Sequence, residues 1–469
     1  MNPRNSIHEK GTITLEIIIA FGLFALCIGS IVVTHYSLGE IVVDTSLDQH
    51  ALYRAHDALQ RAQGLLQGNF TTHVSSTSDH APYHEEVTEH IFDSFTKRID
   101  VTEQWSATPL RPMHITLSTL VTDRTHALGT APCLALASNN TQLTLLGSLS
   151  IGSANYGTDI KIIGNRAYLT TGSPTNADPD FFIIDTSDSA HPFILGNLNI
   201  GSSQGIAAIT IHDSYAFVAT MSLSGQLKVI DINDSTNPHI VASLKLPGVS
   251  GNGIGNSIAY EDDRIYLGTQ NGAGPVFHII DVSDPLVPHE LGSWDPDTII
   301  NGITPRGDRV YVSTGTDNQL RALDISNPAN PVVTATFTIP SAGTSNSGQE
   351  SLLVGSTLYF ARNRGTNSAN DKQLYSIDTT QQDTFTVQNS IRIGASIYDM
   401  VSHTGHLVLA TKDATNDLQL WDTRDPVNPS RLSTLNLPAT PIAIACDDTY
   451  LYSVLSSNSP TLQIIGLSQ

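Results

Sequence analysis

Residues 277–281 read FHIID, and this short apolar stretch ending in aspartate decides the fold because it recurs along the chain. The copies are FFIID at 181–185, LKVID at 227–231, LRALD at 320–324, LYSID at 374–378, LQLWD at 418–422 and LQIIG at 462–466. A second apolar stretch precedes each copy, and a turn rich in Asp, Ser and Pro follows most of them, as in residues 281–288. Apolar stretches of this kind favour strands, and such turns end them.

The copies recur at intervals of 43 to 54 residues, about the length of one four-stranded propeller blade. A strand of the type that ends each unit, residues 145–151, comes before the first copy, and none follows the last copy. Pairing of that early strand with the last copy would close a ring and hide two sheet edges. The sequence therefore predicts a mainly β fold, with a seven-bladed β-propeller over residues 141–469.

The units resemble LVIVD repeats, a bacterial β-propeller family named for its Asp-ending strand. The resemblance covers residues 141–469 and departs from the family pattern at residues 379–384 and at Gly466. It implies a fold and a binding role, and it implies no reaction.

The N-terminal part has a different character. Residues 17–33, IIIAFGLFALCIGSIVV, carry no charge and are near the minimum length of a membrane-spanning helix. Arg4 and Lys10 precede this run and predict that the N-terminus stays in the cytoplasm. The expected localisation is thus a single-pass membrane protein, with the later domains displayed on the cell surface.

Residues 11–16, GTITLE, resemble the type III signal of type IV pilins and pseudopilins. The resemblance implies cleavage by a prepilin peptidase after Gly11, with Thr12 as the new, methylated N-terminus. Glu16 would then pair with the amino group of a neighbouring subunit and set the assembly, because a buried carboxylate needs a partner. Expected partners are therefore the peptidase, other pilin or pseudopilin subunits and the inner membrane; a plain signal anchor is the alternative.

Four regions follow from these patterns: a leader at 1–11, a long helix at 12–67, a small pilin-like β stalk at 68–132, and the propeller. Apolar or small residues three and four apart between 47 and 66 indicate an amphipathic helix. Alternation at 97–105 and 114–121 predicts two paired strands. His73, His80, His84 and His90 lie in this region; a metal site is one interpretation, and a polar surface loop is the favoured one.

Composition limits the function. A net charge of −21 argues against nucleic-acid binding, which needs Lys and Arg to displace counterions. No catalytic motif is found in a suitable context, so we expect no enzyme activity, no cofactor and no metal site. Calcium bound at an irregular loop is an open alternative, whereas the aspartates that end the strands are interpreted as turn caps.

Long polar loops gather on one predicted propeller face, at 172–180, 247–255, 294–297, 341–350 and 362–372. Loops on a rigid scaffold often carry binding, although unused loops drift in the same way. The candidate binding residues there are Asp178, Asp180, Asn252, Asp295, Asp297, Asn346, Arg362, Arg364 and Asp371. Cys133 and Cys446 lie near the predicted closure of the ring, and we predict a disulfide between them.

The function expected from the sequence is that of a minor pilin or pseudopilin that displays the propeller to bind an extracellular protein or glycan. The first alternative is a membrane-tethered propeller receptor or scaffold that does not polymerise. A propeller enzyme is the second alternative.

Overall fold

The computed structural model describes residues 45–68, 73–93, 96–108, 111–122, 142–152, 156–172, 178–201, 205–270, 272–315, 319–339, 348–365, 370–381, 384–403, 405–447, 449–457 and 461–467. The chain divides into two compact units, and each is described by itself. Unit 1 contains helix α2 and strands β1 to β4, and unit 2 contains strands β5 to β32.

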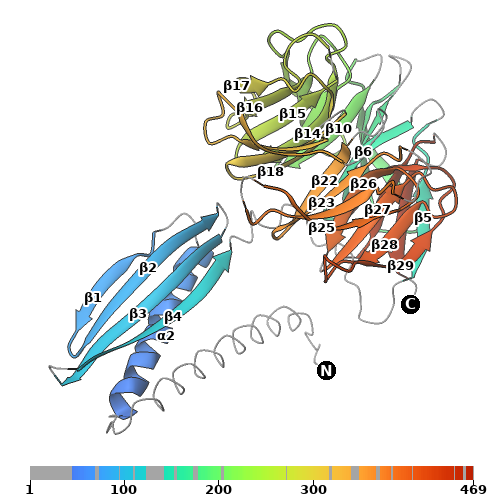
Figure 1. The fold of residues 1–469 in the computed structure, drawn as a ribbon. Helices are drawn as coiled ribbons and strands as arrows, with labels where there is room; N and C mark the ends of the chain where they lie inside the picture. Colours follow the sequence, from blue (N-terminus) through green and yellow to red (C-terminus); the bar gives the residue numbers. More distant parts are fainter. Residues whose placement is uncertain are drawn as a thin grey trace, which may run out of the picture. The chain divides into compact units, whose positions relative to one another are not determined.

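Unit 1 is a four-stranded sheet with one helix along one face (Figure 1). Its elements are α2 (Thr45–Gly68), β1 (Ser76–His80), β2 (Tyr83–Asp93), β3 (Thr96–Thr108) and β4 (Arg111–Thr122). The helix turns Ala51, Ala55, Ala58 and Ala62 toward the sheet, at the spacing of an amphipathic helix. Because these side chains are small, α2 can lie close to β3 and β4, which it contacts.

Two expectations for this region need correction. A long helix was expected over 12–67, but the described helix is short and begins at Thr45; residues 1–44 lie outside the described part of the chain. The histidine-rich stretch expected as a polar loop forms the β1–β2 hairpin instead. The strand pattern was hidden because Glu85 and Glu89 accompany Val87 on the side that faces the helix, so that charges stand where apolar residues are expected.

The predicted localisation is also corrected. Among the residues that the structure describes, no helix is long and apolar enough to cross a membrane. This finding overturns the expectation of a single-pass membrane protein; the segment expected to span, residues 17–33, lies outside the described residues.

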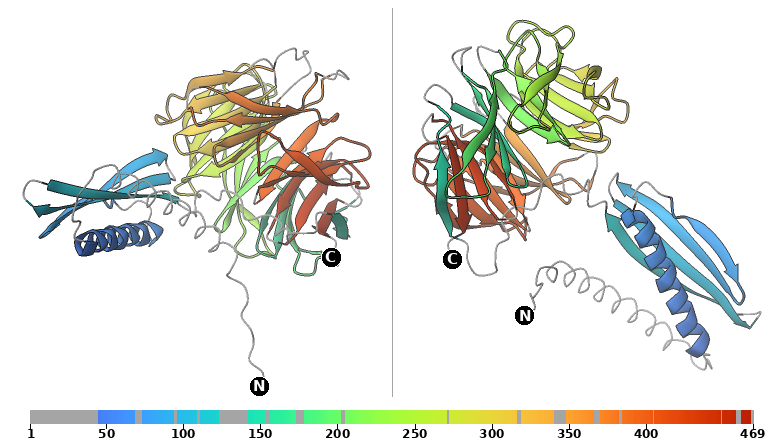
Figure 2. Two further views of the ribbon diagram at one scale, coloured as in Figure 1. Left: turned by 60° about the horizontal axis from the view of Figure 1, so that its bottom comes forward. Right: turned by 180° about the vertical axis from the view of Figure 1, so that it is seen from behind.

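Unit 2 is built, in its described residues, from seven four-stranded antiparallel sheets (Figures 1 and 2). The first strands are β6 (Tyr156–Ile163), β10 (Ile206–His212), β14 (Gly255–Glu261), β18 (Ile300–Arg306), β22 (Gly348–Val354), β26 (Ile397–His403) and β30 (Pro441–Cys446). The second strands are β7 (Arg166–Gly172), β11 (Tyr215–Thr220), β15 (Arg264–Thr269), β19 (Arg309–Thr314), β23 (Thr357–Arg362), β27 (His406–Thr411) and β31 (Leu451–Leu455).

The repeated Asp-ending stretches form the third strands and are mostly buried. They are β8 (Phe181–Asp185), β12 (Leu227–Asp231), β16 (Phe277–Asp281), β20 (Leu320–Asp324), β24 (Leu374–Asp378), β28 (Leu418–Asp422) and β32 (Leu462–Leu467). The fourth strands are β9 (Phe193–Leu198), β13 (His239–Leu244), β17 (His289–Trp294), β21 (Val332–Phe337), β25 (Thr386–Ile391), β29 (Ser430–Leu435) and β5 (Leu143–Leu149). The predicted mainly β fold of repeated four-stranded sheets is confirmed.

The sheets follow one another around a centre. Each first strand packs against the first strand of the next sheet, and β30 packs against β6. The strand from the start of unit 2, β5, pairs with β32 from its end, with Leu143 opposite Leu467. Apolar side chains then continue across the junction, where Val454 and Ile464 share a buried cluster with Leu169.

The aspartates that end the third strands cap the turns that follow. Asp281 Oδ1 accepts hydrogen bonds from Ser283 N at 2.9 Å and from Ser283 Oγ at 2.6 Å, and these bonds lower the pKa of Asp281. The same bond to the backbone N–H two residues on is made by Asp185, Asp231, Asp324, Asp378 and Asp422. These contacts agree with the interpretation of the aspartates as turn caps.

Candidate functional site

The loops that follow the second and fourth strands of every sheet lie at the same edge of the sheets, because neighbouring strands are antiparallel. We call this edge of unit 2 the loop face, and the opposite edge, with its capped turns, the turn face. Four predicted binding residues are exposed on the loop face: Asn252, Asp295, Asp297 and Arg364. Asp178 is half-buried there, and Asn346 lies outside the described residues.

Arg362 and Asp371 are corrected from surface candidates to internal supports of a loop. Both are buried, and they form a salt bridge with each other. Arg362 also donates to the carbonyl oxygens of Lys372 at 2.5 Å and Asn363 at 2.8 Å, while Asp371 Oδ2 accepts from Gly365 N at 3.1 Å. The pair thus ties the two ends of the loop after β23 together.

Asp180 has an equally internal role. It is fully buried, its Oδ2 accepts from Ile200 N at 3.0 Å, and burial raises its pKa to about 6. Five sheets make the same bond: the side chain just before the third strand accepts from the backbone N–H twenty residues later, after the fourth strand. The acceptors are Asp180, Gln226, Gln319, Gln373 and Asp417. We call these contacts latches. The repeated Gln or Asp before the strand was a sequence signal that could have revealed them.

A latch variant is expected to be destabilised. Gln373→Leu removes the acceptor of the Ile393 and Gly394 N–H groups, both at 3.0 Å, and the donor to Asp371 O at 2.8 Å. Leaving buried polar groups unpaired costs about 1–3 kcal/mol each, so the free energy of unfolding should fall by at least that amount. Chemical denaturation of the variant and of Gln381→Leu, an exposed control, measures the difference. Equal losses of unfolding free energy in both variants would show that the latch does not contribute to the stability of unit 2.

Two loops of the loop face pair with each other. Ser250, after β13, and Ala273, after β15, exchange two backbone hydrogen bonds of 2.9 and 3.0 Å. The contact requires glycine at two positions: a Cβ at Gly272 would lie 2.4 Å from Gly253 N, and Gly274 has a φ of 98° and lies against Gly248. Asn252 is exposed in the turn that Gly253 N closes on Ser250 O at 3.2 Å. The two loops are thus held together by backbone hydrogen bonds and carry an exposed polar residue.

An aromatic and an arginine lie beside the exposed aspartates. The guanidinium of Arg321 is 5.2 Å from the centre of the Trp294 ring, a cation–π contact. Burial lowers the pKa of Arg321, and the nearby charge of Asp297 opposes this effect. Trp and Arg are residue types enriched at protein interfaces.

Charged residues that the sequence analysis missed gather on three first strands. Asp159 and Lys161 come from β6, Glu350 from β22 and Asp399 from β26. Lys161 Nζ lies 3.0 Å from Asp159 Oδ1. Burial disfavours the ammonium of Lys161, but the Asp159 and Asp399 carboxylates outweigh this effect and its pKa is raised. The charges of Asp399 and Glu350 thus act on the Lys161–Asp159 pair from other sheets.

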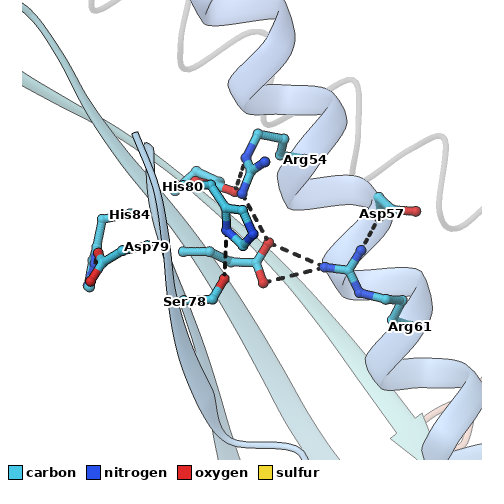
Figure 3. Close-up of polar contacts among 9 residues, drawn as sticks. Arg54, Asp57, Arg61, Ser78, Asp79, His80 and His84 are labelled. Carbon is cyan, nitrogen blue, oxygen red and sulfur yellow. Dashed lines mark hydrogen bonds and ion pairs between the residues drawn. The ribbon is translucent and has the colours of Figure 1, made fainter. Parts of the chain in front are cut away.

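Unit 1 has a polar cleft of about 280 Å³ between α2 and the β1–β2 hairpin (Figure 3). Its lining residues are Arg54, Asp57 and Arg61 of the helix, and Ser78, His80 and Glu85 of the hairpin. Arg61 Nη2 lies 3.3 Å from Glu85 Oε2, and Arg54 Nε donates to Glu103 Oε1 at 3.0 Å. Glu103 is fully buried, and burial raises its pKa. The cleft is therefore lined by ion pairs that join the helix to the sheet.

The histidines of unit 1 do not converge. His84 pairs with Asp79, His90 lies 3.3 Å from Asp100, and His73 lies 3.6 Å from Glu89. In the described part of the chain, no three His, Cys, Asp or Glu side chains are placed to hold a metal ion.

Cys446 of β30 is disulfide-bonded. The other two cysteines of the chain, Cys27 and Cys133, both lie outside the described residues, so the pairing with Cys133 stays a prediction.

Peptide mapping under non-reducing conditions should recover a peptide that joins Cys446 to Cys133. Loss of such a cross-link by Cys446→Ser is expected to lower the free energy of unfolding by about 2–4 kcal/mol, because the unfolded chain gains freedom. Mass spectrometry that finds Cys133 as a free thiol, or bonded to Cys27, would refute the pairing.

Solved structures similar to this chain share its fold at low sequence identity. The WD40 beta propeller domain of Doa1 has a TM-score of 0.51 and 10% identity, covering 70% of this chain and 98% of its own. Virginiamycin B lyase from Staphylococcus aureus has a TM-score of 0.51 and 12% identity, covering 70% of this chain and 99% of its own. Likeness at this identity shows the fold alone, and unit 2 is thus a β-propeller.

The propeller carries LVIVD repeats. The LVIVD repeat family matches residues 201–245 and 303–338, so this part of the predicted resemblance is confirmed. No curated protein matches the chain. The pilin-like N-terminus finds no support in these comparisons, and Gly11, Thr12 and Glu16 lie outside the described residues.

Proposed function

We propose that this chain is a non-enzymatic binding protein whose seven sheets are the blades of one closed β-propeller. The closure is supported by the packing of β30 on β6 and by the pairing of β5 with β32. A closed ring is a rigid platform, and rigid platforms commonly present binding loops. No cofactor is part of this proposal.

The partner binds at the loop face and is a protein. The observation that carries this proposal is the contrast between the two edges of the sheets. Turns on the turn face repeat the same aspartate cap from sheet to sheet. Beyond the shared latches, the loops of the loop face differ from sheet to sheet: they include the paired loops around Ser250 and Ala273, the Arg362–Asp371 tie, and exposed polar residues. Edges that vary on a repeated scaffold are where specific recognition can arise.

Several features of the loop face suit a protein partner. Asn252, Asp295, Asp297 and Arg364 offer hydrogen bonds and both signs of charge. Trp294 and Arg321 add residue types that dominate the binding energy of protein interfaces. Preformed loops lose little entropy on binding, which favours affinity.

Site-specific photo-crosslinking tests the proposal. A photoreactive amino acid is placed at Asn252, Asp295 or Arg364 of the full chain, and at Ser187, Ser283 or Ser326 of the turn face as matched controls. The variants are expressed in the source cells and irradiated. We expect crosslinks to a discrete protein from loop-face positions only.

Crosslinks from the turn face alone, or equal crosslinks from both edges, would contradict the assignment of the face. Crosslinked products that contain no second protein, and whose gel mobility changes after glycosidase treatment, would contradict the assignment of a protein ligand.

A further inference from the structure

Positive charge on the loop face gathers on two neighbouring sheets. Counted from the sheet that begins with β6, these are the fifth, β22 to β25, and the sixth, β26 to β29, whose first strands pack against each other. Four basic residues lie in the loops at this edge of the two sheets: Arg364, Lys372, Arg392 and Lys412. Lys372 is half-buried, and the other three are exposed. We call these four residues the basic group.

One serine holds the loops of the basic group together. Ser396 Oγ accepts a hydrogen bond from Arg364 N at 3.0 Å, and Ser396 O accepts one from Lys412 N at 2.9 Å. Arg392 lies four residues before this serine, beside the backbone that the Gln373 latch fixes. Loops of both sheets therefore converge at Ser396, and three basic side chains start from backbone that is held close to it.

Little negative charge opposes the basic group. In the described loops at this edge of the two sheets, the carboxyl groups are those of Asp371, Asp413 and Asp417. Asp371 is buried against Arg362, and Asp417 is buried as the acceptor of a latch. Asp413 is half-buried, and its Oδ1 accepts from Thr415 N and from Thr415 Oγ1, each at 3.0 Å. This edge is therefore positive at its surface, although the whole chain has a net charge of −21.

The rest of the loop face limits the size of a negatively charged ligand. Asp178 lies in a loop of the first sheet, and Asp295 and Asp297 follow the last strand of the third sheet. A long polyanion that covered the face would meet these carboxylates, and like charges placed together oppose binding. A short acidic segment on the fifth and sixth sheets avoids them. Guanidinium groups also bind carboxylates through two parallel hydrogen bonds, which suits the two arginines of the basic group.

We propose that the basic group binds a short, carboxylate-rich segment of the protein partner. This inference rests on the proposed function and adds the chemistry of the ligand. Exposed charges act over about 8 Å at physiological ionic strength, so the basic group attracts such a segment locally despite the negative charge of the whole chain. Charge complementarity of this kind speeds association and selects among partners.

The test measures binding of fluorescent poly-L-glutamate to the full chain by fluorescence anisotropy. The double variant Arg392→Ser, Lys412→Ser should bind the probe roughly tenfold more weakly, because each exposed ion pair contributes up to about fivefold. The double variant Arg392→Lys, Lys412→Arg keeps both charges and should bind like the wild type. The control variant Arg166→Ser, Lys245→Ser removes two exposed charges from other sheets and should also bind like the wild type.

Three results would overturn the proposal. The first is no binding of poly-L-glutamate to the wild type. The second is equal weakening in the two serine double variants, because only the charge of the whole chain would then matter. The third is tighter binding of a heparin oligosaccharide that carries as many charges as the peptide probe, because the basic group would then suit a sulfated glycan.

Photo-crosslinking from Asn252 separates this inference from the proposed function. The double variant Arg392→Ser, Lys412→Ser should lower the yield of the crosslink to the protein partner. An unchanged yield would mean that the partner binds the loop face without the basic group, and only the inference would fail. Absence of a crosslink from every loop-face position of the otherwise unmodified chain would defeat the proposed function itself.

Discussion

Arg54→Ala is expected to lower the free energy of unfolding of unit 1 by about 3–5 kcal/mol, because it leaves a buried charge without its partner. Glu103 is completely buried beneath α2, and Arg54 Nε donates to its Oε1 at 3.0 Å. Glu85 is also buried, with its Oε2 3.9 Å from Arg54 Nη2, so the same guanidinium faces two carboxyl groups. Hydrogen exchange of the α2 and β3 amides in the full chain reports this loss separately from unit 2.

The same helix supplies the control. Arg61 lies two turns further along and also contacts Glu85, but its side chain is 56% exposed, against 29% for Arg54. Exposed ion pairs contribute about 0–1 kcal/mol, so Arg61→Ala should change little. Adding Glu103→Gln to Arg54→Ala should recover part of the loss, because the amide carries no charge. Equal losses for the two arginine variants, or no recovery in the double variant, would show that burial of charge is not the cause.

Replacement of Leu143–Leu149 by a Gly-Ser segment of equal length should lower the Tm of unit 2 by about 10 °C or more. This strand is β5, the only described partner of β32 on its outer side. Its Leu143 is buried in the cluster that contains Leu418 and Ile465. Loss of one buried leucine alone costs about 2–5 kcal/mol, and the backbone pairing is lost in addition.

The matched control is Leu146→Ser, since Leu146 lies on the same strand with its side chain exposed. This variant should unfold like the wild type. The Gly-Ser variant should also aggregate more readily, because β32 becomes an open sheet edge. A Gly-Ser variant that melts at the wild-type temperature would show that the ring does not depend on β5 for its closure.

The repeated sheets could be predicted from the sequence because their signals are local. A strand such as Phe277–Asp281 carries its apolar residues, and the aspartate that caps its turn, within a few positions. Even the closure by β5 could be predicted, since it follows from the order of repeated segments along the chain. In unit 1 the paired strands predicted at 97–105 and 114–121 are present as β3 and β4. The β1 and β2 strands were harder, because Glu85 and Glu89 stand on the buried side of β2 and break the usual alternation.

The parts of the candidate site that were missed or misplaced depend on contacts that only the folded chain makes. Arg362 ends strand β23 and Asp371 lies in the loop that follows; charged residues at such positions are usually exposed, and only the folded loop shows that these two pair with each other. Glu350 and Asp399 are ordinary strand residues in the sequence, and only the fold brings their charges within electrostatic range of Lys161. The local sequence pattern carries no information on contacts of this kind.

The pairing of β5 with β32 also sets an order of events during synthesis. Strand β5 leaves the ribosome before the rest of unit 2, whereas β32 is made after all the other strands. The earlier sheets can fold as they emerge, but the ring cannot close until its last strand is present. Pairing between segments so far apart in the chain is slow, and an unpaired strand is available to another copy in the meantime. We therefore expect exchange of β5 between two chains to be a route by which this chain misfolds.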